Sequence, residues 1–495
     1  MEDEGLKKPE RQSEGTGMDD VPFRINKWGV LFATLLGTFT VILNNSLMNV
    51  AMPVFMDTFA LSAVEAQWVV TGFAIAMAIT MPLTGFLGDI WGKKRVYLMG
   101  LSFFLLGSIL GTIAWDFSSL VLFRILQGLG GGLVMPLGMV LLFQYFPVGE
   151  RGLATGIWGI AAMVAPAIGP TLGGLVLELA SWNALFLLNV PTGILGIVAL
   201  LYFLRAKEQP RRSRFDFRGY LLFAVGIVAL LVGVDEIPRG GSPVWLIASL
   251  LFIGMGGLIT FVFHSLHTED PLLDLRIFRN PVFASSMVVV GLSTASMFSV
   301  SLLIPLLLQD VFRYGALLTG LALFPQAMMM GVAMPIGGRI LDRYGPRWIV
   351  PIGVTLVALM TLLLGWLAGD VALWLLVLLL ALHGTGTGLM NTPATTAGLN
   401  ALPERQLARA SSINALTRQV AKVMAVVFVM MFFEARRGYY LTTLPREEAG
   451  VLAVQQSFLL MGVVLLLILP VSFLMRKYDQ GNPSGESPSP SAQSG

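Results

Sequence analysis

One apolar stretch near the C-terminus is interrupted by four polar side chains that could do chemistry. They recur at spacings of three, four and four, as Ser411, Asn414, Arg418 and Lys422. This spacing places them on a single face of an α-helix. Lys422 comes far enough along the stretch to lie near the middle of a membrane-spanning helix, where an ammonium group costs at least about 2.5 kcal/mol. Such a group must face a polar cavity, find a partner or lose its proton.

Arg124 and His383 interrupt two other apolar stretches. A guanidinium about six residues into a span needs a partner or a water-filled cavity, so Arg124 either relays protons or charge or pairs with backbone carbonyls. A lone helical histidine more often packs through hydrogen bonds than does chemistry, although His383 is also a candidate for proton relay. Its position opposite Gln127 in an internal repeat favours packing.

Other kinds of chemistry find little support. The chain has no cysteine, three scattered histidines and no clustered carboxylates, so we expect no enzyme and no cofactor. His264 and His267, with Glu269 nearby, lack a third firm ligand, and we expect no metal site.

The elements that must position these residues are membrane spans. Hydrophobic residues make up 55% of the 495 residues and charged residues only 12%, outside the range of soluble proteins. Fourteen apolar runs between Trp28 and Met475 are each long enough to cross a bilayer, which takes about 20 residues. Most Lys and Arg fall in loops on the side of the N-terminus, which predicts cytoplasmic N- and C-termini. No signal peptide is recognised, and the polar tails, 1–26 and 477–495, are expected to be disordered.

A charged hinge between the second and third runs recurs later in the chain. The two copies consist of Gly85, Asp89, Gly92, Lys93 and Arg95, and of Gly338, Asp342, Arg343 and Gly345. Glycine-rich segments at 126–133 and 382–389 form a second matched pair. These pairs predict a duplicated membrane protein with six-helix bundles at 27–205 and 281–476, joined by a linker at 206–280 with two extra spanning helices.

The order of these motifs resembles the major facilitator superfamily, and within it the fourteen-helix drug:proton antiporters of the EmrB/QacA type. The resemblance covers about residues 28–476 and includes the family's Arg, Gln, Gly motif at Arg124, Gln127 and Gly128. It implies an all-α polytopic membrane protein with the major facilitator fold. It also implies that the hinges form a conformational latch, in which Asp89 faces a helix N-terminus or a base.

The fifth apolar run is similar to the motif that accompanies antiport in this family. Prolines kink the helix, and the adjacent glycines offer a smooth face on which another helix can pivot. The expected pivot residues are Pro166, Gly169, Pro170, Gly173 and Gly174.

The first run departs from the family pattern at a functional position. Asn44 stands where many members have an aspartate, so the embedded carboxylate that usually carries a coupling proton is absent. No Asp or Glu lies near the middle of any predicted span, whereas Lys422 stands where the family often has glycine. The expected cavity wall comprises Asn44, Asn45, Asn49, Gln127, Gln326, Asn391, Asn414, Arg418 and Lys422.

The resemblance implies export of amphipathic or lipophilic compounds by alternating access, driven by proton entry. The alternative is a transporter or flippase of lipids or anionic amphiphiles that is not strictly coupled to protons, because the usual carboxylate is missing. The expected partners are the small-molecule or lipid-like substrate, the proton and membrane lipids. An envelope adaptor protein is left open, and no nucleic acid is expected. The expected location is the plasma membrane, as the inner membrane of a bacterium.

Overall fold

The computed structural model describes residues 26–204, 214–237, 243–367, 369 and 372–477, and within these ranges the chain is helical without a β-strand. Thirteen described helices are long and apolar enough to cross a membrane, and one bent pair of shorter helices makes a fourteenth span. The predicted fourteen-span, all-α fold is therefore confirmed. The tails expected to be disordered lie outside the described residues, apart from residues 26 and 477.

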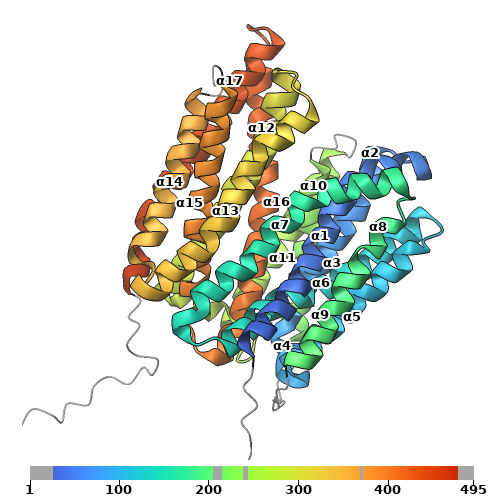
Figure 1. The fold of residues 1–495 in the computed structure, drawn as a ribbon, viewed down its shortest axis with the longest axis vertical. Helices are drawn as coiled ribbons and strands as arrows, with labels where there is room; N and C mark the ends of the chain where they lie inside the picture. Colours follow the sequence, from blue (N-terminus) through green and yellow to red (C-terminus); the bar gives the residue numbers. More distant parts are fainter. Residues whose placement is uncertain (1–25, 205–213, 238–242, 368, 370–371, 478–495) are drawn as a thin grey trace, which may run out of the picture.

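The first half of the chain forms one helical bundle (Figure 1). Its helices are α1 (Lys27–Phe59), α2 (Ala63–Ala66), α3 (Trp68–Thr80), α4 (Leu83–Trp91), α5 (Lys93–Thr112), α6 (Phe117–Tyr145), α7 (Arg151–Leu179), α8 (Ala184–Leu187) and α9 (Asn189–Phe203), with a 3₁₀ turn, η1 (Val148–Glu150), before α7. The second predicted span is the bent pair, since α3 and α4 meet at 55°. Pro82 explains the break, because it lacks the N–H donor that would continue the helical hydrogen bonds.

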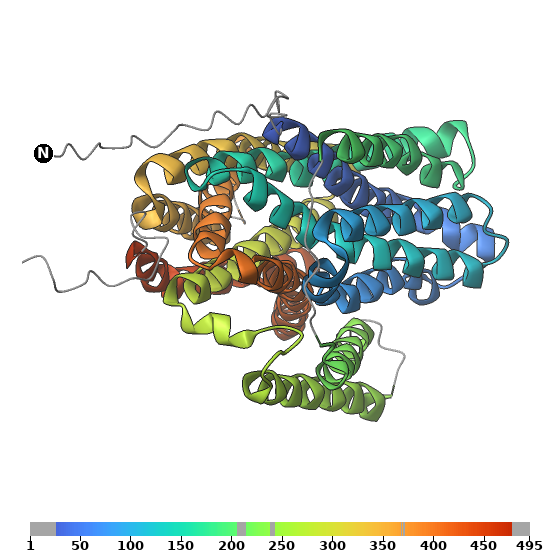
Figure 2. The ribbon, with the colours of Figure 1, turned by 90° about the horizontal axis from the view of Figure 1, so that it is seen from below.

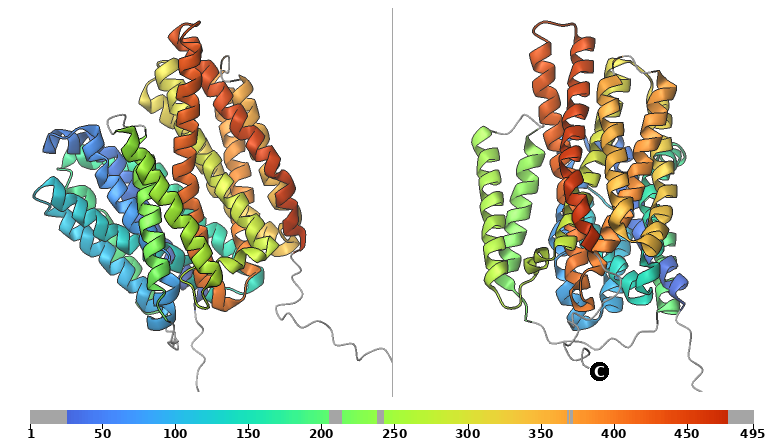
Figure 3. Two further views of the ribbon diagram at one scale, coloured as in Figure 1. Left: turned by 180° about the vertical axis from the view of Figure 1, so that it is seen from behind. Right: turned by 90° about the vertical axis from the view of Figure 1, so that its left-hand side faces the viewer.

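The second half forms an equivalent bundle. It contains α12 (Pro281–Pro305) with a π-helical extension η3 (Leu306–Val311), α13 (Ala316–Tyr344), α14 (Pro346–Leu367), α15 (Leu373–Asn400), η4 (Glu404–Gln406), α16 (Leu407–Tyr440), α17 (Arg446–Ser472) and η5 (Phe473–Lys477). Asn280 starts this bundle by accepting hydrogen bonds from the first backbone N–H groups of α12, with Pro281 at the first helical position. The two bundles lie side by side and diverge toward one end (Figure 3).

The glycine runs explain how tightly each bundle packs. Cβ atoms added at Gly128 and Gly132 of α6 would lie 2.4 and 2.6 Å from carbonyl oxygens of α3, and one at Gly130 would lie 2.4 Å from a carbonyl oxygen of α5. Larger residues would push these helices apart, so the glycines serve close packing. The same alternation recurs on α15, where Gly384 and Gly388 approach α13 and Gly386 approaches α14.

Two further helices, α10 (Phe217–Glu236) and α11 (Val244–His267), lie to one side of the bundles (Figure 2). Asp216 caps α10 and accepts hydrogen bonds from His264 Nε2 and Gly219 N, both at 2.8 Å, and from Leu272 N at 3.3 Å. Burial raises the pKa of Asp216, but the hydrogen bonds and the nearby His264 outweigh it and hold this pKa below its ordinary value. This cluster ties α10, α11 and the chain that follows them into one unit, and α10 packs against α3 and α16.

Candidate functional site

The two bundles meet at the end of the molecule where α1 begins, which we call the closed end (Figures 1 and 3). There, Asp342 on α13 accepts hydrogen bonds from the backbone N–H groups of Gly152 and Leu153, each at 2.8 Å. These donors belong to the first turn of α7, which has no helical acceptors for them. A carboxylate at a helix N-terminus is also favoured by the helix dipole. Asp342 thus joins the second half to the first.

Glycines let α7 and α13 cross at this point with their backbones in contact. A Cβ atom at Gly152 would lie 2.3 Å from the Gly338 carbonyl oxygen, and one at Gly338 would lie 2.0 Å from the Gly152 carbonyl oxygen. Gly156 and Gly159 extend the contact along Met334 of α13. Any side chain at the crossing would separate the two halves.

The first hinge makes the matching contact between α4 and α16. A Cβ atom at Gly85 would lie 3.0 Å from Arg409 Cγ, and the hydroxyls of Thr84 and Ser412 share a hydrogen bond of 2.5 Å. Asp89 is half-buried one turn further along α4. Because Gly85 and Gly338 are equivalent in the repeat, the closed end has two related crossings, α4 on α16 and α13 on α7.

The rest of each hinge turns the chain sharply. Gly92 and Gly345 end α4 and α13 with φ values of 86° and 74°, which glycine adopts without strain. Lys93 is half-buried, whereas Arg95 and Arg343 are exposed. The structure therefore brings the predicted latch residues to the junction or its edge, and Asp342 makes the hydrogen bonds to a helix N-terminus.

Arg124 is fully buried at the centre of a polar network in the first bundle. Its Nε donates to the Val69 carbonyl at 2.9 Å, and its Nη1 donates to Gln127 Oε1 at 2.8 Å. Its guanidinium lies 4.4 Å from the centroid of the Phe73 ring. Gln127 in turn donates to the hydroxyl of Ser108 at 2.7 Å. Arg124 therefore pairs with a backbone carbonyl, as one sequence interpretation expects, and also with a side-chain amide.

Asn44 extends this network to a residue that the sequence did not single out. Asn189 on α9 donates to Asn44 Oδ1 at 2.9 Å, and Asn44 Nδ2 lies 3.5 Å from Gln127 Oε1. The three network amides, the Ser108 hydroxyl and the guanidinium are fully buried, and no described carboxylate pairs with Arg124. One guanidinium nitrogen, Nη2, has no hydrogen-bond partner among the described residues. The network is a buried positive charge held by neutral acceptors.

The second bundle contains another polar network, around Arg418 of α16. Its guanidinium donates to Asn414 Oδ1 at 3.1 Å, to Asn391 Oδ1 at 2.8 Å and to the Thr395 hydroxyl at 2.7 Å. Asn391 passes the network on to the Ser293 hydroxyl at 3.1 Å. The acceptors again are neutral, so this face of α16 keeps a full positive charge.

Lys422 lies one turn beyond Arg418 on the same face. Its ammonium nitrogen is 4.9 Å from the centroid of the Phe298 ring on α12, at cation–π distance. Within the ranges that the structure describes, this nitrogen has neither a hydrogen bond nor an ion pair. Lys422 is therefore available to an anion that enters this part of the bundle.

His383 occupies the place of Gln127 in the second bundle. Its ring nitrogens lie 2.9 Å from the Ser296 hydroxyl and 3.1 Å from Gln326 Nε2, and the side chain is fully buried. Both nitrogens are thus satisfied by neutral neighbours, as the packing interpretation expects. Gln326 is taken up by this contact and is buried as well.

The sequence matches the description Major Facilitator Superfamily over residues 34–426. The chain belongs to the major facilitator superfamily. Two relatives are the uncharacterized MFS-type transporter YhcA of Bacillus subtilis, 32% identical over 84% of this chain and 78% of its own, and multidrug resistance protein Stp of Mycobacterium tuberculosis, 33% identical over 79% and 73%. The crystal structure of the human organic anion transporter MFSD10 has a similar fold, with a TM-score of 0.65 at 15% identity over 90% of this chain and 99% of that one. The resemblance seen in the sequence is confirmed, and the protein is a multi-pass membrane transporter.

In this transporter the expected pivot residues of α7 meet α1 of the same bundle. A Cβ atom at Gly169 would lie 2.3 Å from the Ser46 hydroxyl oxygen, and one at Gly173 would lie 3.4 Å from Leu47 Cδ2. The others face open space or are exposed, namely Pro166, Pro170 and Gly174. The α7 surface that meets the second half is the earlier Gly152–Gly159 segment.

The expected cavity wall divides into three groups in the transporter. The amides Asn44 and Gln127 are fully buried in the Arg124 network, and Gln326, Asn391 and Asn414 are buried in the second bundle. Asn49 is exposed, Asn45 is half-buried, and its Oδ1 has no hydrogen-bond partner in the described part of the chain. Arg418 and Lys422 are half-buried.

Sequence reasoning missed several residues of the site. Asn189 and Ser108 could not be recognised, because the sequence does not indicate which residue of another helix a single polar residue in a span will contact. Gly152 and Gly156 did carry a signal, since two small residues four apart on a membrane helix are typical of close helix contacts.

Proposed function

We propose that this transporter exports amphipathic or lipophilic compounds from the cytoplasm in exchange for protons. The observation that carries the proposal is the closed-end junction, in which two glycine crossings and Asp342 hold the halves together at one end. Such a junction can open without breaking either bundle, because after separation the N–H groups of α7 and the Asp342 carboxylate can each form hydrogen bonds with water instead. Opening one end while the other closes is the alternating access that the fold performs.

The export direction rests on the antiport-type motif of α7 and on relatives such as Stp. Glycines 169 and 173 pack on α1 in ordinary or closer contact, so small shifts there tilt α7 against the second half. Asp89 and Asp342 act as the latches of the two crossings. The orientation with cytoplasmic termini puts both latches on the cytoplasmic side of the plasma membrane.

Proton coupling in this proposal uses bases rather than an embedded acid. Asn44 carries no proton, and the charged groups in the two buried networks are Arg124 and Arg418, each held by neutral acceptors. Lys422 has no described hydrogen bond or ion pair and can exchange a proton with water when the space between the two bundles opens to it. His383 is hydrogen-bonded on both ring nitrogens, so its main role is structural and a role in proton relay is secondary.

The second candidate function is transport of lipids or anionic amphiphiles without strict proton coupling. Two observations favour it, the absence of a described carboxylate in either network and the positive face formed by Arg418 and Lys422. An anionic substrate would itself neutralise that face. In this case a substrate gradient alone would drive transport.

Reconstituted vesicles separate the two. Purified protein in proteoliposomes is given an imposed pH gradient and, in turn, a lipophilic monocation and a single-chain anionic amphiphile. Uphill movement that stops when a protonophore collapses the gradient supports proton-coupled export. Movement that continues after the collapse supports the alternative. If neither compound moves faster than in protein-free vesicles, the proposed substrate class is wrong.

A further inference from the structure

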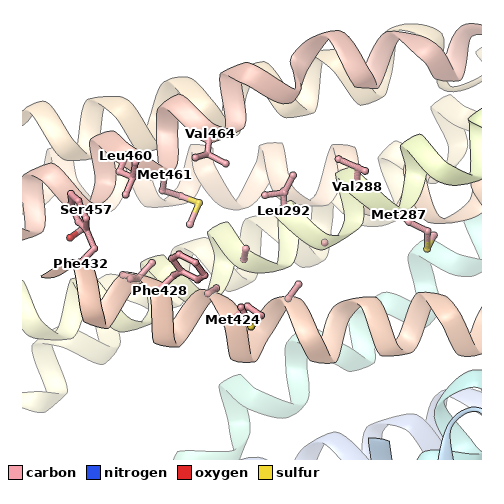
Figure 4. Close-up of a pocket in the computed structure, with 15 residues that line it drawn as sticks. Met287, Val288, Leu292, Met424, Phe428, Phe432, Ser457, Leu460, Met461 and Val464 are labelled. Atoms are coloured by element: carbon pink, nitrogen blue, oxygen red, sulfur yellow. The ribbon is translucent and has the colours of Figure 1, made fainter. Parts of the chain in front are cut away.

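The second bundle contains an apolar pocket of about 600 Å³ between α12, α16 and α17 (Figure 4). Its only polar lining side chain is Ser457, whose hydroxyl donates to the Ala453 carbonyl of its own helix at 2.7 Å. The pocket therefore offers a ligand no free donor or acceptor. A volume of this size is typical of small-molecule sites, and its lining is complementary to hydrocarbon.

The pocket is elongated and open on one side. Its lining on α16 runs from Ala421 to Phe432, eleven residues or about 16 Å at helical rise. Phe428 is 66% exposed and Leu460 is 46% exposed, so the opening lies between α16 and α17. Figure 4 shows lining side chains along the length of the three helices. A long, apolar space can hold an extended alkyl chain.

A positive charge lies beside the wall of the pocket. Ala421 of this wall is followed on α16 by Lys422, whose ammonium lies over the ring of Phe298, three residues after Ala295 of the wall on α12. Arg418 is one turn away on α16 and already has three neutral acceptors. An anion bound beside Ala421 would give Lys422 a charged partner, which it lacks among the described residues.

We propose that this pocket holds the alkyl tail of a single-chain anionic amphiphile whose acidic head binds Lys422. The inference rests on the proposed export of amphiphiles and names their chemical class: a carboxylate or similar anion with a flexible chain. Three methionines in the wall, Met287, Met424 and Met461, adapt to tails of different shape. Lys422 recognises the head by its charge, and the pocket recognises the tail by its length.

The pocket can be filled from two helices without disturbing the networks. A Cβ atom at Gly291 of α12 would lie 3.4 Å from Thr417 Cγ2 and 3.9 Å from Ala421 Cβ, which is ordinary contact. Gly291→Leu and Ala421→Phe therefore occupy the space that a tail would use. Ala248→Phe is the matched control, because Ala248 is exposed on α11 and away from the pocket.

The test uses full-length protein in phosphatidylcholine vesicles and dodecanoate with a photoreactive diazirine at its terminal carbon. We expect labelled peptides from α12, α16 and α17, with labelling competed by excess dodecanoate. Gly291→Leu and Ala421→Phe should each lower labelling about tenfold, while Ala248→Phe leaves it unchanged. Lys422→Gln should weaken competition by dodecanoate about tenfold and leave competition by dodecyltrimethylammonium unchanged.

Three results would overturn the proposal. Equal labelling of the filled variants and Ala248→Phe would mean that the probe only samples bulk lipid. Labelling that excess dodecanoate does not compete would mean a permanently bound membrane lipid. If dodecanoate competes equally well in Lys422→Gln, the acidic head does not bind Lys422. Export of a lipophilic cation by the same vesicles is measured in parallel, so a failed tail site with intact export rejects this inference alone, and absent export rejects the proposed function.

Discussion

Gly152→Ala should weaken the closed-end junction, because it overpacks the crossing and displaces Asp342 with the same methyl group. The added Cβ atom would lie 2.3 Å from the Gly338 carbonyl oxygen and 2.6 Å from Asp342 Oδ1. Neither neighbour can move aside freely, because one is backbone and the other is held by two hydrogen bonds of 2.8 Å. To restore ordinary contact, α7 and α13 must separate by roughly 1 Å.

The cost follows from two effects. Overpacking a close contact costs about 1–3 kcal/mol. Stretching hydrogen bonds to a charged acceptor removes part of their contribution, which is about 1.5–3 kcal/mol each when fully formed. A combined loss of about 2 kcal/mol would reduce the ratio of closed to open junctions about thirtyfold, since each 1.4 kcal/mol is a factor of ten.

Disulfide trapping measures this ratio, because the chain contains no cysteine of its own. The hydroxyls of Thr84 and Ser412 lie 2.5 Å apart at the crossing of α4 and α16. Cysteines at these two positions should therefore form a disulfide only while the two bundles are in contact there. The rate of cross-linking follows the fraction of closed molecules, so in this background Gly152→Ala should slow it by up to about thirtyfold.

The control is Gly149→Ala, three residues before the crossing, where an added Cβ atom meets nothing within 4 Å. It should cross-link at the parent rate. If Gly152→Ala cross-links as fast as Gly149→Ala, the two crossings are not coupled and the account of the junction is wrong.

Two further predictions concern charged side chains held by hydrogen bonds. Gln127→Leu removes a side-chain acceptor of the buried Arg124 guanidinium and should destabilise the protein by about 3 kcal/mol, seen as a fall of several degrees in the apparent Tm in detergent, while Gln127→Glu should recover much of it. Asp216→Asn should lower the apparent Tm at neutral pH. Because the folded pKa of Asp216 is below its ordinary value, its stabilising effect is present above the ordinary pKa of about 3.9 and is lost as pH falls through the lower folded value. The Tm difference from the parent protein should therefore vanish in acid, and a difference that persists there would assign it to packing with His264 instead.

Much of the fold could be predicted from the sequence, because crossing a bilayer demands long apolar runs and the hinges repeat. The break between α3 and α4 was not predicted, although Pro82 marks it. The sequence predicted a latch from its residue types and gave Asp89 more weight than Asp342, and the structure places Asp342 at the N-terminus of α7. A carboxylate's partner at a helix N-terminus depends on how two halves dock, which local sequence does not encode.

The polar residues were harder to assign. Sequence spacing correctly grouped Asn414 and Arg418, because both are on one helix. It could not predict that Asn44 would be buried against Asn189, since that contact joins helices far apart in the chain. Several residues expected on a cavity wall therefore belong to polar networks in this conformation, and among the expected wall residues Lys422 is a charged group without a described hydrogen bond or ion pair.

The most direct test of the account is proton movement during substrate transport. Proteoliposomes with a pH-sensitive dye inside receive a substrate gradient and no imposed pH gradient, and internal pH is recorded for the parent protein and for Lys422→Gln. With a lipophilic monocation as substrate, whose binding does not depend on Lys422, we predict a substrate-dependent pH change in the parent protein that Lys422→Gln abolishes. Substrate flux without any pH change in the parent protein, or an unaltered pH change in Lys422→Gln, would contradict proton coupling through this base.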